Sequence, residues 1–349
     1  MPAIRSFGKN GQFTMVDWTS ELVQTELQGK VLENLGLFQP EYLTQHTFEY
    51  EETISGHTVI LDRVRGERNT MSSSGQRRIR TGAVPHFPLD DALLPQDIMG
   101  KRAWGGADVV ETEAAAIDRK LKQIAKSHNQ TREIARWELL LRGNVYAPNG
   151  TVAMNMFTEF GVTQKIVDFD LGNGATNVLL KQEEVLSHIR LNAQDENIDS
   201  VVILASTEYF NAYINQAGVI AAYNQYASSQ EPLRTRVGAG GDVNWGARRR
   251  FLHGDVLIIE VYESIKGTRC IPAGLAVAIP LGTEVFTTFF SPANTFGYAN
   301  TVAQEAYLFE FEGQYDDKRE VKSESNFANF CRRPALMVIC KMNAATPNP

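Results

Sequence analysis

The sequence predicts an α+β protein built from one long helix, a two-stranded excursion and a block of alternating helices and strands. Apolar residues at helical spacing run through 109–142, strand-like alternation occurs around 57–66 and 76–88, and short apolar strands separate helical segments within 178–320. Of the 349 residues, 43% are hydrophobic and 21% are charged. Such a chain can bury a core in about two or three domains.

The composition narrows the class of protein. The formal net charge of −7 favours solubility and argues against a protein that coats nucleic acid. The cysteines, Cys270, Cys331 and Cys340, are odd in number and lack metal-ligand spacing, so we expect reduced thiols in an intracellular protein. The N-terminal sequence has no apolar core of a secretory signal, and no apolar stretch approaches the roughly 20 residues that span a membrane. We therefore expect a soluble protein without a membrane partner.

Residues 1–43 mix short apolar groups with glycines, which is typical of an arm that packs on another surface; a helix over 17–35 is the alternative. Residues 44–87 are expected to form a two-stranded ribbon. A ribbon is marginal by itself in water, so it must lie against another surface, and nothing adjacent in the sequence offers a matching face.

The ribbon carries an unusual charge. Between 62 and 82 the net charge is +4, because only Asp62 and Glu67 offset its arginines. Arginine binds carboxylates through two parallel hydrogen bonds, so we interpret these residues as protein-contact residues, with phosphate contact as the alternative. The arginines are Arg63, Arg65, Arg68, Arg77, Arg78 and Arg80.

The long helix has recognisable ends. Asp108 and Glu111 have capping-box spacing, and Gly143 suits the residue after a helix. Ser127 and Thr131 lie in a polar waist of mediocre helix formers, which leaves a kink or a break into two helices open. A hairpin over 144–157, turning at Pro148–Asn149–Gly150, and a strand from 165 follow.

The block 178–320 alternates helices with strands. We expect a helix at 182–193, a strand at 199–206 that ends in the N-cap Ser206, and a helix at 207–228 that is single or divided near Gly218. Strands are expected at 254–263 and 272–282. A final strand at 329–342 follows a charged stretch and is expected to return to the earlier sheet.

No motif supports catalysis, a cofactor or a metal ion. Gly238, Gly240 and Gly241 lack the third glycine of a dinucleotide loop and the lysine of a phosphate loop, and Asp168 and Asp170 do not continue as a calcium loop. The six histidines are scattered. A second basic run comprises Arg248, Arg249 and Arg250, which either pair with carboxylates or face DNA.

The order of these elements, together with local motifs, resembles the HK97-fold major capsid proteins of tailed bacteriophages, and among them the lambda-like (E-type) family. The resemblance spans 44–345, while residues 1–40 match poorly. Asn173 stands where the family has arginine, and no residue matches a cross-linking motif. The motifs are VILDRVRGERNT, RRIRTGAVPHFPLDDALLPQDI, LRGNVYAPNGTV, VDFDLGN, DSVVILASTEYFNAY, GDVLIIEVYES and RRPALMVICKM.

The resemblance implies an HK97-like fold and a major capsid protein. Its parts would be an N-arm (1–43), an E-loop (44–87), a P-domain with a spine helix (88–177), an A-domain (178–320) and a C-terminal strand returning to the P-domain (321–349). Pentamers and hexamers of the chain would form an icosahedral shell around double-stranded DNA, assembled in the host cytoplasm and ending in the virion capsid.

The resemblance also implies partners. The E-loop arginines would contact the acidic P-domain of a neighbouring subunit, the basic run at 248–250 is a candidate for facing DNA, and a portal and a scaffold would bind the shell; a decoration protein is left open. The alternatives are a nucleic-acid-binding protein that uses the arginine runs and an encapsulin-like container. An enzyme built on 178–320 is disfavoured because no titrating groups converge there.

Overall fold

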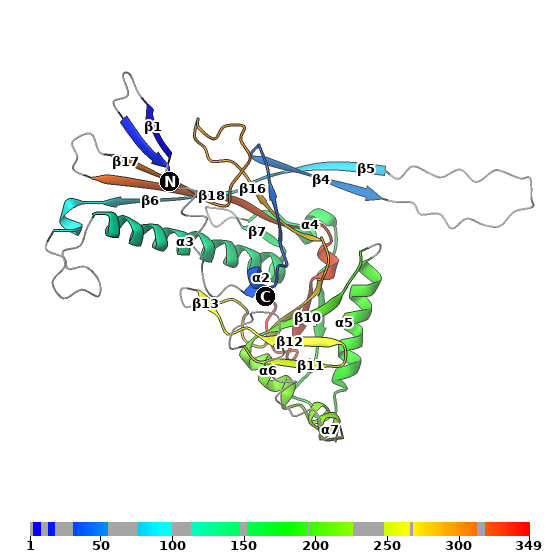
Figure 1. The fold of residues 1–349 in the computed structure, drawn as a ribbon. Helices are drawn as coiled ribbons and strands as arrows, with labels where there is room; N and C mark the ends of the chain where they lie inside the picture. The colour runs from blue at the N-terminus through cyan, green and yellow to red at the C-terminus, as the bar shows by residue number, and fades with distance from the viewer. Residues whose placement is uncertain are drawn as a thin grey trace, which may run out of the picture.

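The computed structural model describes residues 3–7, 13–17, 31–54, 76–99, 113–146, 152–193, 196–225, 248–265, 268–312 and 318–349. Two sheets and one long helix organise this part of the chain (Figure 1). No helix within these ranges combines the length and the apolar character needed to cross a bilayer.

The first sheet has seven strands. Their order is β1-β2-β17-β18-β16-β3, and β6 pairs with β18 in addition. Neighbours are antiparallel except for the parallel pair β16 and β3. The strands are β1 (Ala3–Phe7), β2 (Phe13–Asp17), β3 (Gln39–Tyr42), β6 (His86–Leu93), β16 (Phe286–Phe290), β17 (Tyr307–Glu312) and β18 (Arg319–Cys331).

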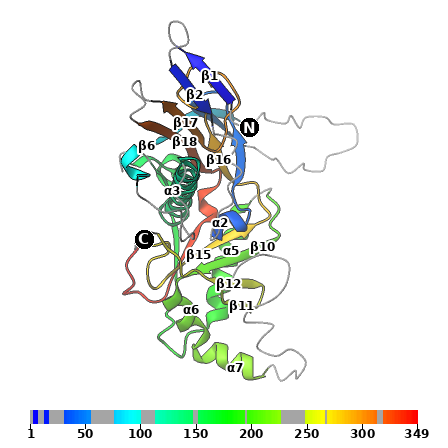
Figure 2. The same cartoon turned by 60° about the vertical axis from the view of Figure 1, so that its left-hand side comes forward.

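The long helix α3 (Glu113–Arg142) lies along this sheet, as Figures 1 and 2 show. It is continuous through the polar waist. The Ser127 hydroxyl donates to the Gln123 carbonyl at 3.0 Å, and the Thr131 hydroxyl donates to the Ser127 carbonyl at 2.9 Å, so both side chains are satisfied on the helix itself. A continuous helix is thereby confirmed from residue 113 onward, whereas the expected capping box at 108–111 lies outside the described residues.

Gly143 ends α3 as the sequence predicts. Its φ of 70° is left-handed, and its N–H donates to the Leu139 carbonyl at 2.8 Å. The predicted hairpin is confirmed by the pairing of β7 (Asn144–Tyr146) with β8 (Val152–Asn155), and its turn at 147–150 lies outside the described residues. The short helix α4 (Met156–Phe160) follows.

The second sheet has six strands in the order β11-β12-β10-β15-β19-β9. Helix α5 (Val178–Ala193) and the pair α6 (Thr207–Ile214) and α7 (Ala217–Gln225) accompany it. The Ser206 hydroxyl caps α6 by accepting from the Tyr209 N–H at 3.4 Å, as predicted. The strands are β9 (Lys165–Asp168), β10 (Ser200–Ala205), β11 (Arg250–His253), β12 (Val256–Glu260), β15 (Leu275–Leu281) and β19 (Val338–Lys341).

The remaining elements are short or stand apart from the two sheets. Among the described strands, β4 (Thr47–Ile54) and β5 (Gln76–Ala83) pair only with each other, and we call them the ribbon. The others are α2 (Val31–Asn34), the 3-10 turns η2 (Pro95–Asp97) and η3 (Pro334–Leu336), and the small hairpin of β13 (Ser264–Ile265) and β14 (Thr268–Arg269).

The structure corrects the expected end of the chain. The predicted single strand at 329–342 is two strands, because Pro334 turns the chain after β18. Strand β18 returns to the sheet beside α3, where it pairs with β6, as expected. Strand β19 does not; it lies between β15 and β9 in the second sheet. Strands β16 and β17, which the sequence placed with the block 178–320, belong to the first sheet instead.

The N-terminal region packs on its own chain. Strand β2 pairs with β17, and Val31 and Leu32 of α2 are buried. The alternative helix over 17–35 is described only at 31–34, and the expected strand at 57–66 lies outside the described residues. The cysteines are free thiols, and burial raises the pKa of both Cys270 and Cys331 to about 12.

Two glycines give a matched test of this fold. Gly143 and Gly161 both have a positive φ, but a Cβ at Gly143 would lie 2.5 Å from the Phe157 ring, whereas a Cβ at Gly161 would meet open space. We expect Gly161→Ala to cost about 1–2 kcal/mol of unfolding free energy from backbone strain. Gly143→Ala should cost more, because the ring must also move. Urea unfolding of the unassembled subunit measures both; equal losses would contradict the crowding at Gly143.

Candidate subunit-contact surface

The ribbon extends away from the rest of the chain and is anchored at one end, which we call its root (Figure 1). Phe48 is buried at the root, where its ring stacks on Phe289 at a centroid distance of 4.7 Å and meets Phe330 edge-on at 5.6 Å. Gly82, the register partner of Phe48, leaves room for the ring: a Cβ there would lie 2.3 Å from Phe48 Cζ. The root therefore belongs to the core of its own subunit.

The ribbon packs on a face that lies far away in the sequence. No segment adjacent in the sequence was expected to offer a matching face, and Phe48 and Tyr50 pack on Phe330 of β18 instead. The partner was missed because it lies about 280 residues further along the chain.

Arg80 connects the root of the ribbon to α4. Its guanidinium forms an ion pair with the Glu159 carboxylate and donates to the Glu159 carbonyl at 2.7 Å. The Tyr50 hydroxyl donates to Glu159 Oε1 at 3.2 Å. Hydrogen bonding from Arg80 lowers the pKa of the Glu159 carboxyl, and burial raises the pKa of Tyr50. Arg80, predicted to contact another subunit, thus serves the root of the ribbon in the single chain.

The described strands of the ribbon are balanced in charge. Three glutamates on β4 accompany three arginines on β5, and Glu52 is the register partner of Arg78. Over 44–87 six arginines meet five acidic residues, so the excess of +4 counted at 62–82 falls to +1. Arg77 and Arg78 lie on β5 near its outer end, while Arg63, Arg65 and Arg68 lie outside the described residues.

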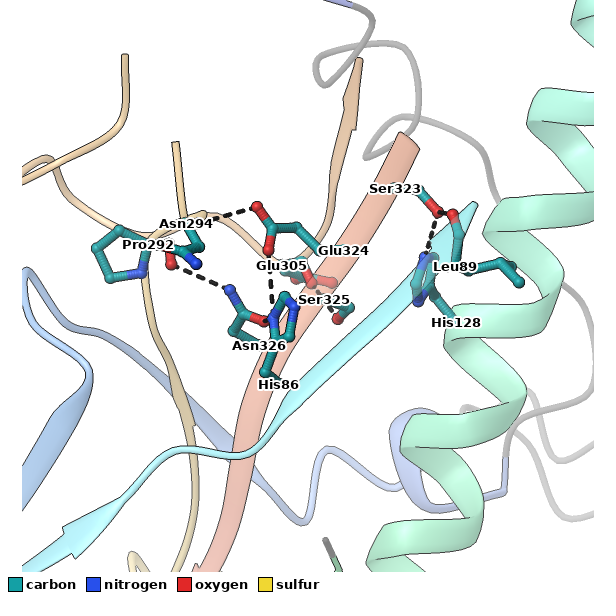
Figure 3. A network of polar contacts seen from close by, with 10 residues as sticks. All are labelled: His86, Leu89, His128, Pro292, Asn294, Glu305, Ser323, Glu324, Ser325 and Asn326. Carbon is teal, nitrogen blue, oxygen red and sulfur yellow. Dashed lines mark hydrogen bonds and ion pairs between the residues drawn. The ribbon is translucent and has the colours of Figure 1, made fainter. Parts of the chain in front are cut away.

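A network of polar contacts holds β18 against β6 and α3 (Figure 3). The Ser323 hydroxyl donates to the Leu89 carbonyl at 2.7 Å, so it accepts from His128 Nε2 at 2.9 Å. This assigns a neutral imidazole with its proton on Nε2. Burial, with Arg132 as a second cause, lowers the pKa of His128 to about 4.

The same strand fixes the loop between β16 and β17. Glu324 accepts from the Asn294 N–H at 2.9 Å and lies 3.2 Å from His86 Nδ1. The Asn326 side chain donates to the Pro292 carbonyl at 3.0 Å. The Ser325 hydroxyl donates to the carbonyl of Glu305, which ends the loop, at 2.6 Å (Figure 3).

Buried charges join α3 to the N-terminal region. The Leu32 N–H donates to Glu133 Oε1 at 3.1 Å. Arg136 lies over the Phe38 ring at 5.2 Å and 4.0 Å from the Glu33 carboxylate. Burial lowers the pKa of Arg136 to about 10, which leaves it protonated at neutral pH. Sequence reasoning missed this cluster because its members read as ordinary polar positions of an amphipathic helix.

Arg248 and Arg249 of the basic run at 248–250 form ion pairs beside the second sheet, and Arg250 belongs to it. Arg249 donates to both oxygens of Glu260 at 2.6 and 2.7 Å, and this contact lowers the pKa of the Glu260 carboxyl. The buried Arg248 forms an ion pair with Glu263. Arg250 begins β11. These pairs favour the carboxylate interpretation of the run over a DNA-facing one.

The sequence is similar to known phage proteins over nearly its whole length. Residues 19–342 match the family model described as phage major capsid protein E. The chain is 36% identical to the major capsid protein of Pseudomonas phage KPP10, over 97% of this chain and 99% of that protein. It is 26% identical to the major capsid protein of Salmonella phage Felix O1 (isolate Felix O1-VT1), over 96% and 98%.

The fold of the chain is similar to that of single chains in solved capsid structures. The mature capsid of bacteriophage PhiM1 aligns with a TM-score of 0.52 at 11% identity, covering 93% of this chain and 90% of that chain. The capsid of cyanophage A-1(L) aligns with a TM-score of 0.51 at 11% identity, covering 92% and 94%. These likenesses confirm the HK97-like α+β fold expected from the sequence.

The contact between Arg80 and Glu159 predicts a pH-dependent root. Because the pKa of Glu159 is lowered in the folded state, its stabilisation is present above the pKa of the unfolded chain and is lost as pH falls through the lower folded value. Glu159→Gln should therefore speed hydrogen exchange of the β4 and β5 amides at pH 7, and the difference should shrink on acidification. Glu184→Gln on α5 is a matched control, since Lys165 lowers its pKa likewise. Equal exchange in both variants would refute the role of Glu159.

His128 predicts a second pH dependence. Its folded pKa is lowered from 6.5 to about 4, so the unfolded chain binds the extra proton first and stability falls as pH drops from about 6.5 to about 4. The loss amounts to roughly 3 kcal/mol at 1.36 kcal/mol per unit of pKa. His128→Gln cannot titrate, so its unfolding free energy should fall less over this range. Denaturant unfolding of the unassembled subunit at several pH values measures this, and parallel curves would contradict it.

Proposed function

The chain belongs to the phage major capsid protein E family, and from that membership we propose how its ribbon builds the shell. The chain is a structural subunit of the icosahedral head of a tailed phage and not an enzyme. Pentamers and hexamers of the chain make the shell, and the ribbon is the E-loop that crosses onto a neighbouring subunit. The observation that carries this proposal is a ribbon anchored at its root and extending away from its own subunit (Figure 1).

The root and the outer part of the ribbon have separate tasks. The root packs Phe48 and Tyr50 into the core and holds Arg80 on Glu159, which sets the direction in which the ribbon leaves. Arg77 and Arg78 lie further out on β5. A marginal ribbon gains most when another surface covers it, so its contacts form together with assembly.

Exposed carboxylates on the same chain suit these arginines. Asp90 on β6 is exposed, and so are Glu113 and Asp118 at the start of α3, which pair with Arg319 and Lys122 in the single chain. On a neighbouring copy they would meet Arg77 and Arg78, and such complementary charges steer assembly and fix the register between subunits. The chain as a whole is acidic, so the excess of positive charge at 62–82 favours contact between the ribbon and a second copy.

The shell encloses double-stranded DNA in this proposal. A net charge of −7 supports a wall that does not hold the genome while DNA is driven in, and Arg248 and Arg249 are paired with carboxylates. A portal and a scaffold are the partners during assembly in the host cytoplasm. The same two ion pairs disfavour a nucleic-acid-binding protein as the alternative.

Charge reversal on the ribbon tests the proposal. We expect the chain expressed alone to form closed shells, tubes or sheets of capsomers in negative-stain electron microscopy, and fewer at high salt because screening weakens the charge contacts. Arg77→Glu with Arg78→Glu should raise the critical concentration for assembly at least about tenfold, or about 1.4 kcal/mol per subunit.

A matched variant controls for charge alone. Arg190→Glu makes the same kind of change at an exposed position on α5, away from the ribbon. It should assemble like the unchanged chain, and both variants should unfold at the same temperature as the unchanged subunit. Normal assembly of the ribbon variant at low salt would refute the proposed contact.

A further inference from the structure

We propose that residues 291–304, which make up the loop between β16 and β17 except for Glu305 and Ala306 at its end, dock on a second copy of this chain through the exposed side chain of Phe296. We call this segment the docking loop. The inference rests on the shell function proposed above and adds a second, apolar contact to the charged contact of the ribbon.

The docking loop is held in a defined shape. The N–H groups of Tyr298 and Thr301 donate to the carbonyls of Thr295 and Tyr298 at 3.0 and 3.2 Å, and Asn300 adopts a positive φ of 58°. The Tyr298 ring packs edge-on against Tyr307 of β17 with centroids 4.9 Å apart. Together with the contacts from Glu324 and Asn326 described above, these interactions fix the loop on the first sheet.

The fixed loop presents an aromatic ring to solvent. The Phe296 side chain is 104% exposed and Val302 is 63% exposed. Burying an exposed phenylalanine side chain is favourable by roughly 1.5–3 kcal/mol. Because the loop is ordered before contact, little conformational entropy is lost when the ring is buried. A rigid exposed aromatic is typical of an anchor at a protein interface.

The composition of the loop identifies the class of partner. Residues 291–304 contain no Asp, Glu, Lys or Arg, in a chain that is 21% charged. Interface cores are depleted in charge and enriched in aromatic residues. A segment without Lys or Arg lacks the positive charge that dominates binding to the phosphates of DNA or of lipid headgroups. The partner is therefore a protein surface.

Hydrogen bonds to Leu43 tie the docking loop to the ribbon. The Leu43 N–H donates to the Phe290 carbonyl at 2.9 Å, and the Ala303 N–H donates to the Leu43 carbonyl at 2.9 Å. Leu43 lies four residues before β4, so both ends of the loop are fixed beside the segment that enters the ribbon. Figure 1 shows the loop, in orange, close to the root. A neighbour that receives the ribbon therefore approaches the docking loop as well.

The chain itself offers an apolar surface to receive the ring. Leu89 and Leu94 are 37% exposed and Met99 is 74% exposed, all on or next to β6 and η2. Leu94 and Met99 follow the end of β6, the strand that carries the exposed Asp90 assigned above to the ribbon arginines. A second copy can thus accept the ribbon and the docking loop on one surface, which makes a heterologous contact that repeats around a ring.

A photochemical cross-link tests the contact directly. Phe296→p-benzoylphenylalanine places a reactive ketone on the exposed ring, and purified heads carrying this variant are irradiated and digested for mass spectrometry. We expect adducts that join residue 296 to a peptide of a second copy of the chain. Adducts with a different head protein, such as a decoration protein, would overturn the proposal, and so would intact heads without any adduct.

Two substitutions test whether the contact matters for assembly. Phe296→Ser should raise the critical concentration for assembly by roughly tenfold or more, since the buried ring is lost. Phe296→Leu retains an apolar side chain and should change it less than about threefold. Both variants should unfold like the unchanged subunit, because the Phe296 side chain is fully exposed in the described part of the chain.

The two proposals fail in different ways. If the unchanged chain never forms shells or capsomers, whether alone or together with its scaffold, the proposed self-assembly is wrong. If shells form, and Phe296→Ser assembles as well as Phe296→Leu, the docking loop is wrong while the ribbon contact is untouched.

Discussion

The buried strand β18 imposes the constraint on which the first sheet depends. Its side chains are almost all shielded from water, yet Ser323, Glu324, Ser325 and Asn326 are polar. A buried polar group without a partner costs about 1–3 kcal/mol, so neighbouring elements must supply hydrogen bonds. The Leu89 carbonyl, His128 and the loop after β16 supply these hydrogen bonds (Figure 3). The hydrogen bonds therefore fix the positions of these groups relative to β18.

Strand β18 also contacts the two segments that we assign to assembly, the ribbon and the docking loop. Phe330, at the far end of the same strand, receives Phe48 and Tyr50 from the ribbon, and Glu324 and Asn326 hold the docking loop. The ribbon and the loop are therefore mounted on one rigid strand. Since a closed shell repeats one contact geometry many times, small errors in the angle between subunits would accumulate, and a shared rigid support limits them.

Sequence patterns predicted the elements that apolar periodicity or turn chemistry marks. The body of α3, its end at Gly143, the hairpin after it and the cap at Ser206 are local signals, and each is confirmed. The same reasoning failed for β18 because a strand of alternating serine, glutamate and asparagine resembles a solvated segment. It also joined β18 to β19, although Pro334 separates them and the two strands lie in different sheets.

The candidate site was predictable only in part, for a related reason. The arginine content of the sequence indicated the ribbon as a contact segment. It did not indicate the glutamates of β4, which balance the charge of these arginines, or Glu159, which lies 79 residues from its partner Arg80. Long-range pairs leave no local pattern. A single exposed phenylalanine leaves none either, because the same residue in the sequence would be assigned to the core. Phe296 points to an interface because two observations occur together in the structure: the residues around it are hydrogen bonded, and its own ring is exposed. The loop is therefore already ordered in the free subunit, so binding a partner does not carry the entropic cost of ordering it.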